Sequence, residues 1–206
     1  MKRPLPRYLA RCLICLLAAL GGACGDGAAK APPGFTQQRR GDLHDFDYLI
    51  GAWTTQQRRL QARNSGSSEW VSAPANVHCA ARYLDGEAIV EESRSPGNAA
   101  AGLFLYAFDR QRRQWSIYWM NAKTGQLDPP LIGGFAAGRG EFYGEDHDCS
   151  RAIRVRVLWS TSHRDHARWE QAFSYDNQAW ETNWVSDFTR SAQPRACSAD
   201  LRPAAG

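Results

Sequence analysis

The sequence lacks the features that mark several common classes of protein. The longest apolar run, from Leu9 to Leu20, contains Arg11 and is too short for a stable membrane-spanning helix. No Gly-x-Ser-x-Gly elbow, phosphate-binding glycine loop or nucleic-acid-binding motif occurs. The net charge is only +4 and the arginines are scattered, so nucleic acid is not expected as a partner. A strand-helix-strand rhythm and solenoid or propeller repeats are also missing, which excludes α/β and repeat folds.

Metal ligands with the spacing of a known site are missing as well. The acidic run 145–148 lacks the spacing and the glycine of a calcium loop. His163, Asp165 and His166 lie in one loop, but no cysteine or acid elsewhere completes a zinc set. Haem could be held only through His78, because the last three predicted strands carry no histidine. We therefore expect no metal and no cofactor.

The N-terminus has the parts of an export signal. A basic region with Lys2, Arg3 and Arg7 precedes the apolar run, and small residues precede Cys24. Small residues before a cysteine resemble the bacterial lipoprotein site, where the cysteine is lipidated, but Leu20 lies four residues before Cys24 instead of three. We expect export to the periplasm, with the protein either anchored through a lipid on Cys24 or released.

Composition divides the chain into four parts. Residues 1–24 form the predicted signal peptide, and residues 25–41 are a flexible linker by composition. Residues 42–190 carry the strand patterns of one domain, and residues 191–206 form a tail rich in Ala, Pro and Ser.

The chain has six cysteines, and four of them remain once the apolar run of the signal is removed. If Cys24 is lipidated, one disulfide and one free thiol is the natural count in an oxidising compartment. We expect a bridge between Cys149 and Cys197 that pins the tail to the domain, with Cys79 as a buried thiol. Sequence alone does not determine this connectivity.

Alternation of residue type predicts the last three strands. The runs 153–159, 169–173 and 180–184 alternate β-branched or aromatic residues with polar ones and are joined by polar loops. A meander with Val157 opposite Trp169 and Phe173 opposite Trp180 keeps like faces together. One face then carries Ile153, Val155, Val157, Trp159, Trp169, Gln171, Phe173, Trp180, Thr182, Trp184, Ser186 and Phe188. The other face is charged, with Arg156, Glu170 and Asn183 in one cross-strand row that indicates surface pairing.

Earlier segments continue the pattern. A short helical segment at 42–50 leads into predicted strands at 51–60, 69–83 (interrupted at Pro74), 88–92, 103–108, 114–120, 131–135 and 141–143. Pairing Tyr106 with Ile117 and Phe104 with Trp119 gives a second aromatic face. About ten short strands joined by hairpins, with one short helix, predict an all-β fold, a single antiparallel up-and-down β-barrel.

Several motifs resemble a known family. They are Asp45-Phe46-Asp47-Tyr48-Leu49-Ile50-Gly51-x-Trp53, Arg58-Arg59-Leu60, Arg113-x-Trp115-x-x-Tyr118, Gly140-Glu141-Phe142-Tyr143, Arg168-Trp169-Glu170-Gln171-Ala172-Phe173-Ser174 and Trp180-Glu181-x-Asn183-Trp184. Together they resemble an uncharacterised bacterial family of lipocalin-like domains of unknown function, within the calycin superfamily, over residues 42–190. The resemblance implies a barrel closed by Arg190 covering Trp53 and supplies no catalytic residues. The segment 145–149 departs from it, because a cysteine and several acids replace a plainer turn.

The predicted aromatic face indicates a cavity for a small hydrophobic or amphipathic molecule, since apolar walls with a few neutral polar groups are typical of such sites. Its predicted lining is Phe104, Tyr106, Trp119, Val157, Trp159, Trp169, Gln171, Thr182, Trp184 and Ser186. A packed core without a cavity is the alternative. A barrel enzyme with Glu170 or Asp187 turned inward, and a structural module that binds a partner with its outer face, are the other hypotheses.

Overall fold

The structure is a computed structural model that describes residues 38–95, 97, 99–176, 178–191 and 197. The predicted signal peptide, Cys24 and most of the predicted linker and tail lie outside the described residues. In the part of the chain that is described, no helix is long and apolar enough to cross a membrane.

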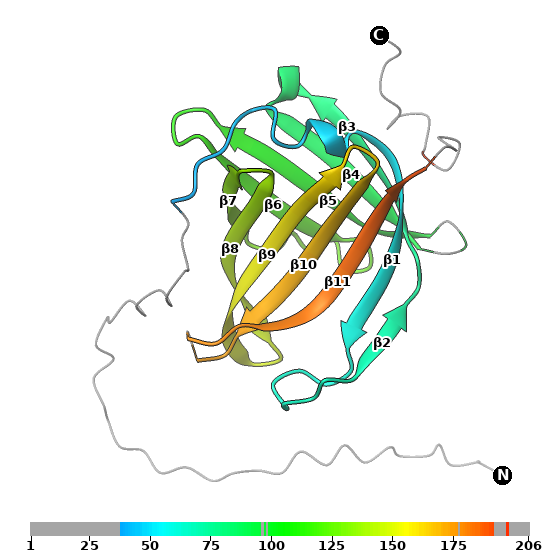
Figure 1. Ribbon diagram of the computed structural model, residues 1–206, viewed down its shortest axis with the longest axis vertical. Coiled ribbons are helices and arrows are strands. Elements are labelled where there is room, and N and C mark those ends of the chain that lie inside the picture. The colour runs from blue at the N-terminus through cyan, green and yellow to red at the C-terminus, as the bar shows by residue number, and fades with distance from the viewer. Residues whose placement is uncertain (1–37, 96, 98, 177, 192–196, 198–206) are drawn as a thin grey trace, which may run out of the picture.

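The fold is a closed antiparallel β-barrel. Each strand pairs with its neighbours in chain order from β3 to β11, and β1 lies between β3 and β11, so ten strands close the wall (Figure 1). The short strand β2 extends the far end of β1. The strands are β1 (Gly51–Leu60), β2 (Trp70–Ala73), β3 (Val77–Tyr83), β4 (Ala88–Arg94), β5 (Ala100–Asp109), β6 (Gln114–Asn121), β7 (Leu131–Ala136), β8 (Arg139–Asp148), β9 (Arg151–His163), β10 (His166–Ser174) and β11 (Glu181–Arg190). The predicted fold class is confirmed.

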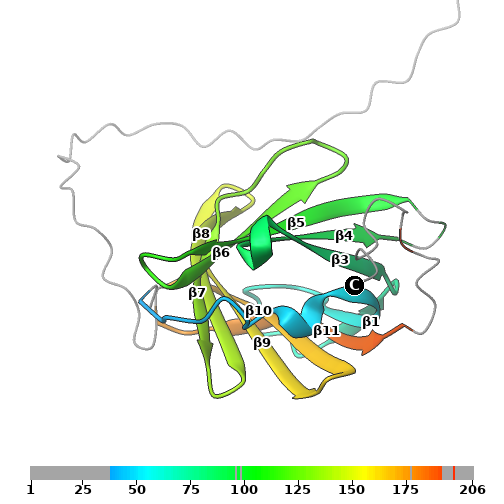
Figure 2. The ribbon, with the colours of Figure 1, turned by 90° about the horizontal axis from the view of Figure 1, so that it is seen from above.

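A segment before β1 covers one end of the barrel. It contains a single turn of 3-10 helix, η1 (Asp47–Leu49), where the sequence predicts a short helix. Phe46 and Leu49 are fully buried, and Figures 1 and 2 show this segment crossing the barrel end. The ordered contacts begin within the predicted linker, because the backbone N–H of Gly41 donates to the carbonyl of Arg113 at 2.8 Å.

Aromatic side chains fill the covered end. The central cluster contains buried residues from opposite walls: Phe46, Leu49, Trp53, Ala80, Ile89, Tyr106, Trp115, Ile117, Phe142, Val157, Trp159, Ala167 and Phe188. The ring of Phe46 lies 4.8 Å from Tyr106 and 5.2 Å from Trp115, centroid to centroid. Such edge and tilted contacts stabilise the core beyond the area that they bury. The cluster also identifies the inner face of every strand that contributes to it.

The register of β10 against β9 differs from the predicted one by two residues, and Phe173 lies opposite Glu181 of β11 rather than Trp180. Trp169 lies opposite Trp159 rather than Val157, and Gln171 lies opposite Val157. Because side chains alternate with a period of two, this shift leaves the inward and outward faces of β9 unchanged. The hairpin length, which cross-strand patterning does not determine, accounts for the difference.

Arg190 and Trp53 form the contact at the closure that the family resemblance implies. They are register partners in the β1–β11 pairing, and the guanidinium carbon lies 4.2 Å from the centroid of the indole ring. The same guanidinium donates to the carbonyls of Tyr48 at 2.7 Å and Ile50 at 3.0 Å. One side chain therefore joins the last strand, the first strand and the covering segment.

The disulfide differs from the predicted one. Cys79 of β3 is bonded to Cys197, and Cys149 is a free, exposed thiol. Cys79 pairs with Ala52 of β1, and both pack with Cys197 on the outer side of the barrel. The tail is thus attached to β3 rather than to the β8–β9 turn. Residues 145–148, where the sequence indicates a turn, instead belong to β8, which continues to Asp148; Asp148 binds Arg63, and Cys149 lies in the turn that follows.

Candidate functional site

Several inward side chains keep partial exposure near the middle of their strands. Phe104 faces Trp119, and Trp169, Gln171 and Trp184 belong to the inner face that carries Val157 and Trp159. All five are partly exposed, as are Tyr48, Phe108 and Phe135 at the η1 end, whereas Phe46, Trp53, Trp115 and Phe142 at that end are fully buried. Side chains that point into a barrel and still contact solvent line a hollow. This hollow lies in the half of the barrel away from η1 and shares that half with a second buried cluster of Ile153, Val155 and Phe173.

Aromatic pairs form opposite walls of this hollow. The rings of Phe104 and Trp119 lie 4.4 Å apart, and those of Trp169 and Trp184 meet edge to face at 5.2 Å. The Trp119 ring covers Gly102, where an added Cβ would lie 2.3 Å from it. At the end of the hollow farthest from η1, which we call the mouth, the guanidinium carbon of Arg59 lies 3.7 Å from the centroid of the Trp184 ring. Burial lowers the pKa of Arg59, and the nearby charge of Arg63 lowers it further.

A chain of hydrogen bonds begins at the mouth and follows the β11–β1–β3 wall inward. The indole N–H of Trp184 donates to Gln57 Oε1 at 3.1 Å, and Gln57 Nε2 donates to Thr55 Oγ1 at 3.1 Å. The backbone N–H of Asn76 also donates to Thr55 Oγ1, at 3.1 Å. Thr55 and Gln57 are both buried, so these bonds satisfy polar groups that would otherwise destabilise the fold.

The chain continues to a buried carboxylate. Asn76 Nδ2 donates to Ser93 Oγ at 3.0 Å, and that oxygen lies 3.5 Å from His78 Nε2. His78 Nδ1 lies 2.5 Å from Glu91 Oε1, while the Tyr106 hydroxyl donates to Glu91 Oε2. Opposite an ionised carboxylate, which only accepts, Nδ1 of His78 is the donor. In neutral His78, Nε2 is then an acceptor directed at Ser93.

This polar group lies at the boundary between the hollow and the aromatic core. Glu91 is 1% exposed and His78 is 6% exposed. Register pairs Glu91 with Phe104, a wall residue of the hollow, and Tyr106 contacts Phe46 of the core. Burial raises the pKa of Tyr106 well above its ordinary value, and the charge of Glu91 raises it further. Tyr106 therefore remains a phenol that donates to Glu91.

Two donors in the same region have no hydrogen-bond partner among the residues that the structure describes. They are the hydroxyl of Tyr48 and the indole N–H of Trp159, whose rings lie 6.1 Å apart. Burial raises the pKa of Tyr48 well above its ordinary value, and the charge of Glu91 adds to the effect. Unsatisfied buried donors are rare because each loses its hydrogen bonds to water.

The predicted cavity residues divide between hollow, core and outer face. Phe104, Trp119, Trp169, Gln171, Trp184 and Ser186 face the hollow, and Tyr106, Val157 and Trp159 lie in the core cluster or at its edge. Thr182 is a correction, since it pairs with Ala172 on the outer face. The cause is a β-bulge, in which Gln171 pairs with Trp184 and Ala172 with Thr182, leaving Asn183 as the extra residue.

The same bulge reverses Trp180. Its ring lies against Tyr143 and under the guanidinium of Arg156, which is an outward residue of β9. Trp180 is therefore part of the outer surface, and the predicted row of Arg156, Glu170 and Asn183 does not form.

The carboxylates proposed for an enzyme also point outward. Arg168 donates to Glu170 at 2.5 Å and to Asp187 at 3.0 Å, and all three side chains are partly exposed. Among the described residues the buried carboxylate is Glu91, which the strand patterns did not single out. The alternation Ile89-x-Glu91-x-Ser93 could have identified it, because Ile89 is a core residue and the period of two places Glu91 and Ser93 on the same face.

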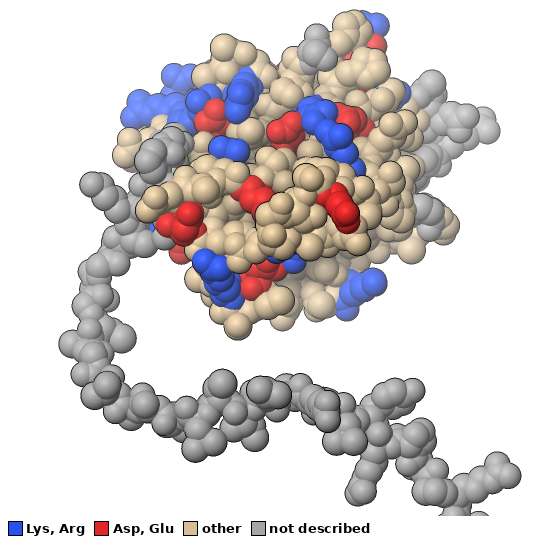
Figure 3. Space-filling view, turned by 60° about the horizontal axis from the view of Figure 1, so that its bottom comes forward, with Lys and Arg blue, Asp and Glu red and all other residues tan. Residues whose placement is uncertain are grey.

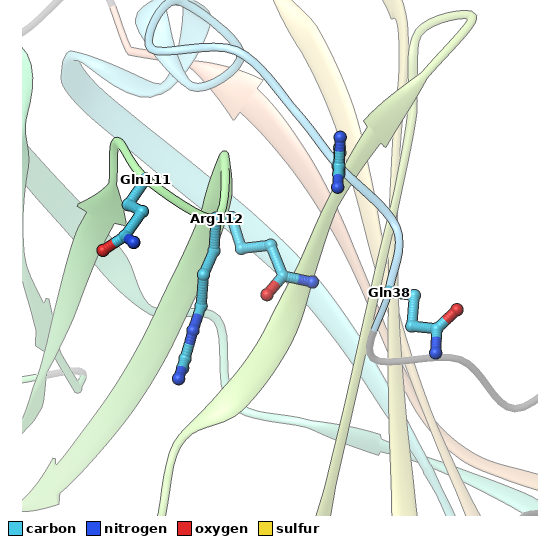
Figure 4. Close-up of a pocket in the computed structure, with 5 residues that line it drawn as sticks. Gln38, Gln111 and Arg112 are labelled. Carbon is cyan, nitrogen blue, oxygen red and sulfur yellow. The ribbon is translucent and has the colours of Figure 1, made fainter.

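Other surface features offer weaker sites. Among the described residues no group of three or more His, Cys, Asp or Glu side chains could hold a metal ion. An open depression of about 600 Å³ lies between the N-terminal segment and the β5–β6 turn, lined by Gln38, Arg40, Gln111, Arg112 and Gln114 (Figure 4). It contains no aromatic wall. Basic and acidic side chains are interspersed on the face seen in Figure 3, so that face has no cationic patch for nucleic acid.

The description of this site rests on its geometry alone. No model of a known protein family matches the chain, and no curated protein matches it.

Proposed function

We propose that the protein binds a small hydrophobic or amphipathic molecule in the hollow of its barrel. The observation that carries this proposal is the partial exposure of the inward residues Phe104, Trp119, Trp169 and Trp184. Exposed indole and phenyl surface inside a barrel gains free energy when an apolar ligand removes it from water. The chain of hydrogen bonds from Trp184 to Glu91 supplies polar groups that can orient the ligand.

The proposal includes export, with the protein periplasmic and either anchored through a lipid on Cys24 or released. The segment 1–24 has the composition of a signal peptide. The disulfide between Cys79 and Cys197 supports this location, because disulfides form and persist in oxidising compartments.

Fluorescence titration with N-phenyl-1-naphthylamine, a neutral apolar probe, tests the binding. We expect saturable enhancement of the probe signal and quenching of tryptophan emission. Gln171→Trp adds bulk inside the hollow and should abolish the signal, whereas Glu170→Trp adds the same side chain to the outer face and should not. Circular dichroism checks that both variants fold. Equal signals from the two variants would place the probe elsewhere and reject the proposal.

A second candidate function, acyl-ester hydrolysis, rests on Ser93, His78 and Glu91. Their order and contacts are those of a nucleophile, a base and an orienting carboxylate. In this scheme Ser93 Oγ attacks the ester carbonyl while His78 Nε2 takes its proton and returns it to the leaving alcohol. Water then releases the acid from the acyl-serine. The hollow would supply the site for the acyl chain.

Labelling with an alkyl fluorophosphonate distinguishes this second function from binding alone. An acyl-transfer site predicts a covalent adduct on Ser93, located by peptide mass spectrometry, which is lost in His78→Ala. Probe binding in the hollow with no adduct on Ser93 would exclude the hydrolase and leave the binding protein.

A further inference from the structure

We infer that the ligand of the hollow carries a neutral oxygen acceptor, such as a ketone or another carbonyl, that accepts hydrogen bonds from Tyr48 and Trp159. This inference rests on the proposed function and names the chemical class of the ligand. Both donors are buried and unpartnered among the described residues, as are Nε of Arg156 on the outer face and Nδ2 of Asn183 at the bulge; of these four groups, Tyr48 and Trp159 pack against one another in the interior.

The position of the two donors supports this role. Trp159 pairs directly with Trp169, a partly exposed residue of the hollow, so its indole lies where the hollow meets the core. Tyr48 packs against Trp159, with ring centroids 6.1 Å apart. Trp159 also contacts Phe46 and Phe188, so both donors lie at the inner end of the hollow, against the core that fills the η1 end, and only the leading atoms of a ligand would reach them.

The negative charge of Glu91 near Tyr48 and Trp159 disfavours a ligand that carries a carboxylate. Glu91 is buried, and the hydrogen bonds that it accepts come from His78 and Tyr106. Burial is the main cause of the raised pKa of Tyr48, and the charges of Glu91 and Asp45 add to it. A ligand carboxylate beside these donors would meet a second negative charge in a medium of low polarity, where repulsion is strong. An uncharged carbonyl oxygen accepts the same two hydrogen bonds without that repulsion.

Competition against the naphthylamine probe tests the inference with matched ligands. Nonan-2-one and 2-methylnon-1-ene have the same shape and differ in the acceptor oxygen. We expect the ketone to displace the probe at a lower concentration than the alkene and than nonanoate. Tyr48→Phe removes only the hydroxyl and should weaken the binding of nonan-2-one roughly three- to tenfold, which corresponds to the loss of one hydrogen bond. The affinity for 2-methylnon-1-ene should not change. Tyr143→Phe removes an outer-face hydroxyl and serves as the control.

The outcomes separate this inference from the function on which it rests. No binding of the probe rejects the proposed function itself. Binding of the probe with equal displacement by ketone and alkene, tighter binding of nonanoate, or an unchanged ketone affinity in Tyr48→Phe overturns only the ligand class. The unliganded variants supply a second readout, since Tyr48→Phe should not lower the midpoint of urea unfolding. A clear fall would show that the hydroxyl already has a partner, which also overturns the inference.

Discussion

At the scale of single residues, Glu91 is the least expected feature of the molecule. A carboxylate that is 1% exposed is stable in a barrel only because His78 and Tyr106 bond both of its oxygens. From the strand patterns, His78 is the one candidate haem ligand and Glu170 and Asp187 are the candidate inward acids. Composition does not distinguish these acids, and the choice depends on which face each strand turns inward.

Glu91→Ala should therefore lower the free energy of unfolding by about 3 to 5 kcal/mol, because it leaves the buried His78 and Tyr106 without their partner. Glu170→Ala is the matched control on the surface and should cost under about 1 kcal/mol. Urea denaturation followed by tryptophan fluorescence measures both. Similar losses in the two variants would mean that Glu91 is not the buried partner of His78.

At the scale of the elements, residue alternation predicts most strands but not their exact pairing. The predicted segments correspond to β1 and to β3 through β11, and Pro74 separates β2 from β3 as its missing N–H requires. The bulge at Asn183 could not be predicted, because an extra residue in one strand leaves no mark in a pattern of alternation. Its consequence is local, since it turns Thr182 and Trp180 outward while Trp184 and Ser186 remain inward.

The closure between β1 and β11 depends on Arg190. Arg190→Ala removes the cover of Trp53 and the bonds to the carbonyls of Tyr48, Ile50 and Arg164, and we expect a loss of about 2 to 4 kcal/mol. Arg190→Lys keeps the charge but lacks the planar fork, so it should restore only part of the stability. Chemical denaturation measures the series. Full stability in the lysine variant would show that charge alone accounts for the closure.

The disulfide joins the tail to β3 across 118 residues of sequence. A bridge that closes so long a loop restricts the unfolded chain, and Cys79→Ser should lower the free energy of unfolding by about 4 kcal/mol. Cys149→Ser, which changes the exposed free thiol, should have little effect. Denaturation of both variants under non-reducing conditions is the measurement, and the opposite order of stability would restore the predicted Cys149–Cys197 pairing.

At the scale of the whole molecule, the sequence analysis correctly predicted a ten-strand barrel because each strand carries the period of two and no helix pattern competes. The patterns do not show where in the barrel the partly exposed inward side chains lie. That depends on the segment before β1, whose residues Phe46 and Leu49 fill one end through tertiary contacts. The alternation that predicts strands contains no information about how the segment before β1 packs into the barrel.

The barrel should lose stability in alkaline solution. Burial raises the pKa of Tyr143 and of Tyr175 to about 12, and it raises the pKa values of Tyr48 and Tyr106 well above the ordinary one. In the unfolded chain these phenols ionise near pH ~10, so above that pH the unfolded state binds fewer protons and the free energy of unfolding falls. Urea midpoints at about pH 8 and about pH 11 measure the fall. It should be smaller in a Tyr143→Phe, Tyr175→Phe double variant, and an equal fall would assign it to other groups.

The most direct test of the binding proposal is a crystal structure grown with a brominated methyl ketone, 9-bromononan-2-one. We predict an anomalous bromine peak inside the barrel among Phe104, Trp119, Trp169 and Trp184, with the carbonyl oxygen beyond it toward Tyr48. A fully occupied crystal whose bromine peak lies only on the outer surface, with the hollow filled by side chains, would contradict the account.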